Sequence, residues 1–203
     1  MAYFPFYIDI KDKKFLVVGG GKVALRKVEK LLQFEPKITV VAPFICDEIR
    51  KLGVSIIERK FIDSDIDNIF CAISATDDEV VNGHIFKLCS EKNILVNTVD
   101  DKDKCGFIFP ALVNKNGITA GITSSGKSPV YAKYIRERLE NLLDGNADIT
   151  ETLFKYRKRI KSEIKNEADR KIVFERLLAL CLSRDEIDDN LVSKLIEEAN
   201  NEN

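Results

Sequence analysis

Short apolar runs alternate with helical spacing along the first half of this chain. Runs typical of buried parallel strands occupy residues 15–18, 37–41, 55–58, 69–74 and 94–99. Between these runs, apolar residues recur every three or four positions, which predicts helices over residues 23–33, 44–52 and 79–91. Strands that alternate with helices in this way predict an α/β fold built on a doubly wound parallel sheet.

The pattern changes after residue 106. Residues 107–113 and 118–124 are strand-like, and the residues that join them, Asn114-Lys115-Asn116-Gly117, are a strong signal for a β-hairpin turn. Ser128-Pro129 then has the pattern of an N-cap followed by a first-turn proline, which predicts a helix that runs to about Leu143. After Asn146 the spacing is helical throughout and predicts three more helices.

These patterns divide the chain into three expected parts. Residues 1–112 form the parallel-sheet domain, residues 113–145 a dimerisation segment, and residues 146–203 a small C-terminal helical domain. A single hairpin and a few short helices bury little apolar surface by themselves. We therefore expect a homodimer whose interface is built from the region 107–145.

Composition narrows the classes of function. The 203 residues include 32 Lys and Arg and 33 Asp and Glu, and this near-neutral balance argues against a general nucleic-acid binder. No apolar run approaches the length of a membrane span, and the N-terminus lacks the features of a signal peptide. The five cysteines form no C-x-x-C pair, which favours reduced thiols in the cytoplasm. His84 is the single histidine, so we expect no His-rich metal site.

A glycine turn follows the first predicted strand. Gly19, Gly21 and Ala24 have G-x-G-x-x-A spacing, with a strand before them and a helix after them. In this context the glycines permit a tight turn and a close backbone approach to a diphosphate, which the helix N-terminus attracts. Lys22 lies inside the turn, within reach of a phosphate or of solvent. The pattern favours a dinucleotide site over a glycine-rich turn that binds nothing.

The choice of dinucleotide is open from the residues alone. The second strand of such a site ends with an acidic residue where it binds NAD, and an arginine nearby accommodates the phosphate of NADP. Here the strand over residues 37–41 is followed by Ala42-Pro43-Phe44, which is neither acidic nor basic.

The carboxyl ends of the predicted strands select further site residues. Ligands of doubly wound sheets bind at that edge, which is formed here by the glycine turn, Ala42-Pro43, residues 75–78 and residues 97–101. Asp100 has the position of a carboxylate that takes a proton at the edge of the cofactor cleft. The alternative is that Asp100 and Asp101 begin a polar loop, with Lys102 as an ion partner.

Several motifs, in order, resemble one family. They are Val17-Val18-Gly19-Gly20-Gly21-Lys22-Val23-Ala24, Ala75-Thr76-Asp77-Asp78, Asn97-Thr98-Val99-Asp100, Phe107-Ile108-Phe109-Pro110-Ala111 and Ser124-Ser125-Gly126-Lys127-Ser128-Pro129. Together they resemble precorrin-2 dehydrogenase, the dehydrogenase/chelatase module of siroheme synthase. The resemblance covers about residues 1–145 in detail and the helical tail only in character.

The resemblance implies an enzyme with a Rossmann-type NAD-binding domain. It would oxidise the tetrapyrrole precorrin-2 to sirohydrochlorin with NAD, in siroheme biosynthesis, and would act as a homodimer. Asp100 matches the catalytic aspartate of the family. Including the residues expected from the glycine turn and the strand ends, the cofactor-binding set is Gly19, Gly21, Lys22, Val23, Pro43, Phe44, Ala75 and Thr76.

The implied substrate carries eight carboxylates and needs cationic or hydrogen-bonding partners. Residues that precede the N-terminus of the helix after Pro129 are suited to an anion, and Asn97 stands at a strand end. The expected substrate-binding set is Asn97, Ser124, Ser125, Lys127 and Ser128. A serine phosphorylated in one branch of the family aligns with Ser124, without implying that Ser124 is modified.

Two alternatives stay open. Some family members also insert ferrous iron into sirohydrochlorin, so the chain is either a dehydrogenase alone or a bifunctional enzyme that takes ferrous iron as a second substrate. The other alternative is a non-catalytic module that senses NAD or a tetrapyrrole. Asp100 at the expected cleft position argues against this second alternative, because a sensor needs no group to take the proton.

Overall fold

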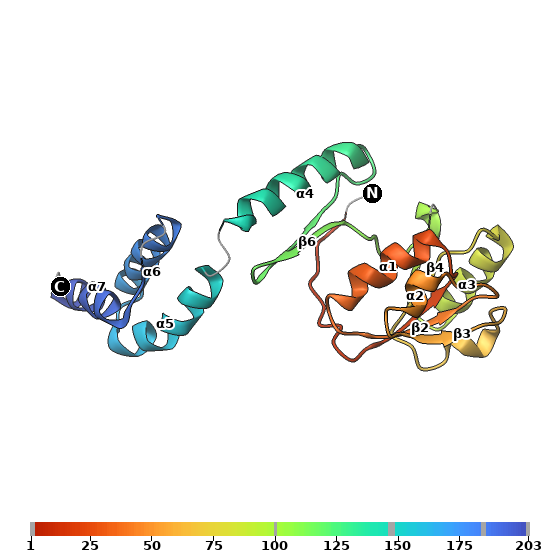
Figure 1. Ribbon diagram of the computed structural model, residues 1–203, viewed down its shortest axis with the longest axis horizontal. Coiled ribbons are helices and arrows are strands. Elements are labelled where there is room, and N and C mark those ends of the chain that lie inside the picture. The colour runs from red at the N-terminus through yellow and green to blue at the C-terminus, as the bar shows by residue number, and fades with distance from the viewer. Residues whose placement is uncertain (1–2, 100, 146–148, 184–185, 202–203) are drawn as a thin grey trace. The chain divides into compact units, whose positions relative to one another are not determined.

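The computed structural model describes residues 3–99, 101–145, 149–183 and 186–201. The chain forms two compact units, Met1–Pro110 and Ala111–Asn203. The first unit holds a five-stranded sheet, and the second holds a two-stranded sheet and four helices (Figure 1). Each unit is built around its own buried apolar residues, and each is described by itself below.

The first unit is the expected doubly wound sheet. Its five parallel strands have the order β3-β2-β1-β4-β5. The strands are β1 Lys14–Val18, β2 Lys37–Val41, β3 Ser55–Ile57, β4 Cys71–Ser74 and β5 Leu95–Thr98. The α-helices are α1 Lys22–Leu32, α2 Asp47–Arg50 and α3 Glu79–Glu91. The sequence-based fold class is therefore confirmed.

Strand alternation creates a separate apolar core on each face of this sheet. Successive side chains of a strand point to opposite faces. Phe15 and Val17 of β1 accordingly pack in the core that contains α1 residues, whereas Leu16 and Val18 pack in the core that contains α3 residues. These cores fix β1 in the centre of the sheet, with α1 and α3 on opposite faces.

The strand register brings the carboxyl ends of the strands to one edge. Val18, the last residue of β1, lies opposite Val41 of β2 and Ser74 of β4, and Ser74 lies opposite Thr98 of β5. The segments that follow these four strands therefore begin at the same level. This is the edge at which doubly wound sheets bind their ligands.

The largest departures from the predicted bounds are in one helix of the first unit and in the first strand of the hairpin. The helix predicted over residues 44–52 is only Asp47–Arg50, because Cys46 is extended and its N–H donates to the Gly20 carbonyl (2.9 Å). The strand predicted over residues 107–113 begins at Ala111 instead. Phe107 and Phe109 pack against the core of the parallel sheet, so this stretch is not free to join the hairpin.

Two 3-10 turns complete the first unit. One of them, η1, spans Asp63–Ile66 in the connection between β3 and β4. The other, η2, spans Lys102–Lys104 after β5. Asp65 closes η1 by accepting from the Ile62 N–H (2.9 Å) and from both terminal nitrogens of Arg59 (2.6 and 2.8 Å). Hydrogen bonds from this guanidinium hold the pKa of Asp65 below its ordinary value.

The second unit begins with the predicted hairpin. Strands β6 Ala111–Lys115 and β7 Ile118–Ile122 are antiparallel and are joined by the two residues Asn116 and Gly117. Both joining residues have positive φ (51° and 74°), as a tight hairpin turn with the twist of its strands requires. The Asn116 side chain donates to the Leu143 carbonyl (2.6 Å), which ties the turn to the end of the following helix.

Four helices follow the hairpin. They are α4 Pro129–Asp144, α5 Ile149–Glu163, α6 Glu167–Leu182 and α7 Asp189–Asn201. Ser128 caps α4, as predicted, by accepting from the Tyr131 N–H (3.3 Å), and Gly145 is the C-cap of the helix. The last three helices share a core that includes Ile160, Leu177 and Val192. Among the described residues, none of the helices is long and apolar enough to cross a membrane.

Candidate active site

The first glycine of the turn between β1 and α1 has no room for a side chain. Gly19 has φ +124°, and a Cβ there would lie 2.2 Å from the Ala75 carbonyl oxygen. Its N–H donates to the Val41 carbonyl at the end of β2 (3.0 Å). Gly19 therefore lets the backbone turn sharply while it stays in contact with the ends of the two neighbouring strands.

The second glycine is just as confined, although it occupies a variable position of the sequence motif. A Cβ on Gly20 would lie 2.0 Å from the Phe44 carbonyl oxygen, and its own carbonyl accepts the Cys46 N–H. Gly20 was not among the site residues predicted from the sequence. The run of three successive glycines was the signal that could have drawn attention to it.

The third glycine faces open space. Gly21 is the N-cap of α1 and has an ordinary extended conformation (φ −93°), and nothing lies within 4 Å of a Cβ built there. No side chain caps α1, and its first turn holds no acidic residue. Because the first N–H groups of a helix have no partner within the helix, this end of α1 is suited to an anion. The geometry fits a dinucleotide diphosphate.

The first turn of α1 contains the next predicted residues. Lys22 begins the helix and its side chain is exposed, while Val23 is half-buried. Ala24 is fully buried, so the small third position of the motif packs helix against sheet, as the spacing predicts. The turn and the helix thus present one cation and free backbone donors to the same edge of the sheet.

The end of β2 supplies an apolar surface. Ala42 is buried, Pro43 is exposed, and the Phe44 ring is 74 % exposed. Pro43 has no N–H to donate, so this short stretch offers a ligand mainly carbon atoms. An exposed aromatic ring beside a glycine turn is suited to contact with a planar base.

The end of β4 forms the other wall of the glycine turn. The Ala75 N–H donates to the Val18 carbonyl (2.8 Å), which fixes Ala75 against β1. Thr76 is half-buried, and its hydroxyl lies 2.7 Å from the Asn82 side-chain oxygen. Asp78 caps α3, with its carboxylate accepting from the N–H groups of Val80 (2.9 Å) and Val81 (3.1 Å). The N-terminus of α3 is therefore occupied by the chain itself.

The end of β5 is packed tightly. Asn97, a predicted substrate ligand, is buried, and its amide donates to the Phe107 carbonyl (3.0 Å) and to the Cys105 sulfur (3.4 Å). The Asn97 nitrogen is thus used within the fold, and its oxygen is the atom left for a ligand. The buried Thr98 hydroxyl has no hydrogen-bond partner among the described residues. Asp100, the predicted catalytic residue, lies outside the described residues.

The residue after Asp100 has a structural task. The Asp101 carboxylate accepts from the backbone N–H groups of Asp103 (3.1 Å) and Lys104 (3.3 Å) and forms an ion pair with the Lys104 ammonium (2.7 Å). Hydrogen bonding to Lys104 lowers the pKa of Asp101. Burial raises the pKa of the Cys105 thiol, which donates to the carbonyls of Thr98 and Asp101 (3.1 Å each).

The remaining predicted residues lie in the second unit, before α4. The Ser124 hydroxyl accepts the Ser128 N–H (2.8 Å), and the Ser128 hydroxyl caps the helix. Ser125 and Gly126 turn the chain with positive φ (54° and 79°), and the side chains of Ser125 and Lys127 are exposed. Both capping hydroxyls still have a proton to donate to an anion.

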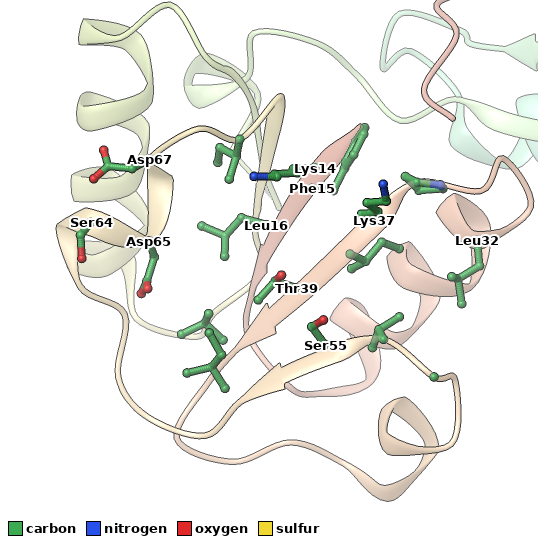
Figure 2. A pocket seen from close by; sticks show the side chains of 17 residues that line it. Lys14, Phe15, Leu16, Leu32, Lys37, Thr39, Ser55, Ser64, Asp65 and Asp67 are labelled. Atoms are coloured by element: carbon green, nitrogen blue, oxygen red, sulfur yellow. The ribbon is translucent and has the colours of Figure 1, made fainter. Parts of the chain in front are cut away.

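A separate groove of about 610 Å³ lies over one face of β1 and β2. Figure 2 shows Leu16 and Thr39 on these strands, Ser55 on β3, and Ser64 and Asp65 of η1 on the other side of the groove. The β3–β4 connection contains a short 3-10 turn and no α-helix, which leaves this part of the face uncovered. The described site residues predicted from the sequence do not line it, so the groove is separate from the candidate dinucleotide site.

Comparison with known proteins gives three findings. Residues 6–111 match the family described as "Putative NAD(P)-binding". Siroheme synthase of Pseudoalteromonas translucida is 41% identical over 180 residues, which are 86% of this chain and 38% of that protein. Siroheme synthase of Thioalkalivibrio sulfidiphilus is 38% identical over 183 residues, which are 88% of this chain and 37% of that protein. This chain therefore spans less than two fifths of the length of these curated relatives.

A solved structure titled "SirC, precorrin-2 dehydrogenase" is similar over nearly the whole chain. The TM-score is 0.71 at 24% sequence identity, and the match covers 98% of this chain and 100% of that one. At this identity the likeness shows a shared fold. It includes both units of the chain, the helical tail as well as the parallel sheet.

Proposed function

We propose that this chain, which belongs to the NAD(P)-binding family that residues 6–111 match, is an NAD-dependent dehydrogenase that oxidises precorrin-2 to sirohydrochlorin in siroheme biosynthesis. The observation that carries the proposal is the uncapped N-terminus of α1 beneath the glycine turn, which fits a dinucleotide diphosphate. The substrate follows from the siroheme synthases that resemble this chain and from the precorrin-2 dehydrogenase that shares its fold.

Three segments of the first unit would hold the dinucleotide. Gly19 and Gly21, with Lys22 and Val23, offer backbone donors and one cation to the diphosphate. The apolar end of β2 offers a surface to the adenosine, and the end of β4 forms the opposite wall. The full set is Gly19, Gly21, Lys22, Val23, Pro43, Phe44, Ala75 and Thr76.

The arginines near β2 support NAD over NADP. A ribose phosphate needs a cation that is free to bind it. Residues 42–60 contain two arginines, and both are engaged: Arg50 forms a short ion pair with Glu58, and Arg59 binds Asp65 through two hydrogen bonds. Neither arginine is therefore free for the ribose phosphate of NADP.

The proposed reaction removes a hydride and a proton from precorrin-2. NAD, when bound, supplies the hydride acceptor, so the protein has to orient the substrate and receive the proton. We assign the proton to Asp100, which follows the end of β5 at the ligand-binding edge of the sheet. Its neighbour Asp101 is committed to the η2 turn and to Lys104, which leaves Asp100 as the carboxylate for chemistry.

The substrate carboxylates need donors that are not fully used inside the protein. Ser125 and Lys127 have exposed side chains, and Ser124 and Ser128 each keep a hydroxyl proton to donate. The Asn97 side-chain oxygen is an acceptor for a pyrrole N–H. These five residues are the proposed substrate contacts.

We propose a cytoplasmic homodimer, with residues 113–145 as the dimerisation segment. This segment carries exposed apolar side chains, including Ile118, Val130 and Leu142, that a partner subunit would cover. Sedimentation or light scattering at micromolar concentration tests the dimer, and a mass equal to one chain contradicts it. Five free thiols are consistent with a reducing compartment.

The proposed activity is tested with enzymatically generated precorrin-2 and NAD. The wild-type chain should form NADH, and Asp100→Asn should lose at least about 100-fold in kcat while it binds NAD as tightly as the wild type. The exposed carboxylate of Asp103, in the η2 turn, provides the matched control Asp103→Asn. Full activity of Asp100→Asn refutes the catalytic assignment, and an inactive wild-type chain refutes the reaction.

A second activity, insertion of ferrous iron into sirohydrochlorin, is favoured by the relatives named siroheme synthase, because siroheme is the iron complex of that ring. Ferrous iron would then be a second substrate. Metal insertion measured without NAD separates the two activities. A rate no higher than that of the reaction without protein leaves the dehydrogenase as the only activity of this chain.

A further inference from the structure

A buried amide lies behind the candidate dinucleotide site. Asn82 is in α3 and is 7% exposed, and it shares the inward face of this helix with Ile85 and Cys89. Helical spacing favours an apolar residue at such a position. An amide buried without hydrogen-bond partners destabilises the folded state. The partners of the Asn82 side chain therefore indicate its role.

The three side-chain hydrogen bonds of Asn82 go to the last residue of β4 and to the segment that follows it. Its side-chain oxygen accepts hydrogen bonds from the Ser74 hydroxyl and the Thr76 hydroxyl, both at 2.7 Å. Its side-chain nitrogen donates to the Thr76 carbonyl (3.0 Å). The opposite orientation of the amide would place its oxygen against that carbonyl, so the contacts determine which end is which.

The segment that Asn82 holds is the wall on which the glycine turn rests. Ala75 lies between the two anchored residues, its carbonyl is the atom that excludes a side chain at Gly19, and its N–H bonds to Val18. On the other side, the Ser74 carbonyl accepts the Val99 N–H (2.9 Å), directly before Asp100. One amide in α3 therefore fixes a segment that contacts both the cofactor turn and the strand that leads to the proposed base.

We propose that Asn82 is a positioning residue for the dinucleotide: through Ser74 and Thr76 it holds the Ala75–Thr76 wall in the conformation that binds NAD. The inference rests on the proposed function, since it requires NAD to bind at the glycine turn. Asn82 itself does not face the ligand. It acts through the backbone of the segment that does, so its loss changes NAD affinity without removing any ligand contact.

Asn82→Asp gives the sharpest test, because it makes one hydrogen bond depend on pH. A protonated carboxyl can still donate to the Thr76 carbonyl, whereas a carboxylate at the same place would repel it. We expect NAD to bind to Asn82→Asp about tenfold more weakly at about pH 8 than at about pH 5, measured by isothermal titration. Wild-type protein should show no such change over this range.

Ser90→Asp is the matched control, because it adds the same charge to an exposed position of α3. This variant should bind NAD with the same affinity as the wild-type protein at both pH values. Groups that titrate elsewhere, including Asp78 and Glu79 on α3 and the His84–Asp63 pair between α3 and η1, are present in both variants and cancel in the comparison. Equal pH profiles for Asn82→Asp and Ser90→Asp would overturn the proposal.

Removal of the amide gives a second readout. Asn82→Ala should weaken NAD binding at least about tenfold at neutral pH, at a temperature where circular dichroism shows that the variant is folded. If it does not fold, Ser74→Ala removes a single hydrogen bond of the set and should weaken NAD binding about threefold. Wild-type affinity in both folded variants overturns the proposal. A wild-type chain that binds no NAD instead refutes the proposed function, and the two failures are thereby distinct.

Discussion

Two strand-to-helix turns at the same edge of the sheet differ in what satisfies the helix N-terminus. The turn from β1 to α1 has Gly21 as its N-cap, and no side chain caps the helix. The turn from β4 to α3 has Asp78, whose carboxylate accepts from the N–H groups of Val80 and Val81. The two helices begin beside neighbouring strands of one sheet, so the fold alone does not explain the difference.

The comparison shows where this chain leaves room for an anion. At α3 the protein supplies its own negative group, and a phosphate placed there would meet a carboxylate. At α1 the corresponding donors and the positive end of the helix dipole are left for a ligand. The glycines of the first turn are needed for close packing against Ala75 and Phe44, and the third one keeps the approach to the helix clear.

A side chain at Gly19 should disrupt the turn from β1 to α1 more severely than any other change considered below. Gly19→Ala places a Cβ against the Ala75 carbonyl at a φ that L residues rarely adopt, so we expect a loss of about 2–4 kcal/mol in unfolding free energy and of NAD binding. Gly83→Ala in α3 is the matched control, since nothing lies near its Cβ and alanine should stabilise that helix by about 0.5–1 kcal/mol. Denaturant unfolding measures both, and a stable Gly19→Ala protein that binds NAD contradicts the packing argument.

A capping carboxylate in the turn from β1 to α1, like the one in the turn from β4 to α3, should reduce NAD binding and leave the stability of the fold almost unchanged. Gly21→Asp introduces an N-cap carboxylate where the backbone is extended and the space is empty, so unfolding free energy should change by only a few tenths of a kcal/mol. NAD affinity should fall about 100-fold, because the carboxylate takes the helix donors and repels the diphosphate. Gly21→Asn caps the helix without a charge and should lose less NAD affinity than Gly21→Asp. Titration calorimetry measures the NAD affinity of both variants. Unchanged affinity in Gly21→Asp would place the cofactor elsewhere.

Removal of the carboxylate that caps α3 should have a smaller effect, which is confined to the free energy of unfolding. Asp78→Ala removes the cap of α3, and we expect a loss of about 1 kcal/mol in unfolding free energy. Asp78→Asn retains an acceptor and should recover most of this loss. Neither variant should gain an anion site that competes with NAD. A fall in NAD affinity beyond about threefold in Asp78→Asn would mean that Asp78 also serves the cofactor.

The smallest effect is expected at the third turn of this edge, after β5. Asp101 closes that turn, and its pKa is lowered by Lys104. A carboxyl with a folded-state pKa below the unfolded value stabilises the fold above the unfolded pKa, and this contribution disappears as pH falls through the folded-state pKa. Carboxyl NMR titration should show the depressed pKa in the wild type and a return toward the ordinary value in Lys104→Met. An unchanged titration in that variant would rule out Lys104 as the cause.

The sequence predicted most of the fold because its strands and caps are local signals. The parallel strands, the hairpin and the N-cap Ser128 all lie where periodicity and turn residues indicated. The errors have tertiary causes. Residues 107–110 were expected to be a strand but pack on the parallel sheet through Phe107 and Phe109. The helix predicted from Phe44 begins only at Asp47, because the backbone of residues 44–46 packs against Gly20, whose carbonyl accepts the Cys46 N–H.

The candidate site was predictable where a motif encodes it, and less so where contacts join distant segments. The G-x-G-x-x-A spacing identified Gly19 and Gly21, and the strand-end rule selected Ala75 and Thr76. The run of three glycines is the one local sign of Gly20, whose constraint comes from Phe44 far along the chain. Asn82 was equally hidden, since a polar residue within an amphipathic helix is expected on its solvated face, whereas here the amide is buried and bonded to the preceding turn.

The central place of β1 in the sheet has a kinetic consequence. β1 pairs with β2, its neighbour in sequence, and with β4, which is synthesised much later. The glycine turn is complete only when Ala75 has docked against Gly19, so the proposed cofactor site depends on a long-range pairing. NAD can then bind the native protein alone. We expect it to slow unfolding in stopped-flow experiments while the refolding rate stays unchanged, so the cofactor would protect this chain once folded without guiding it there.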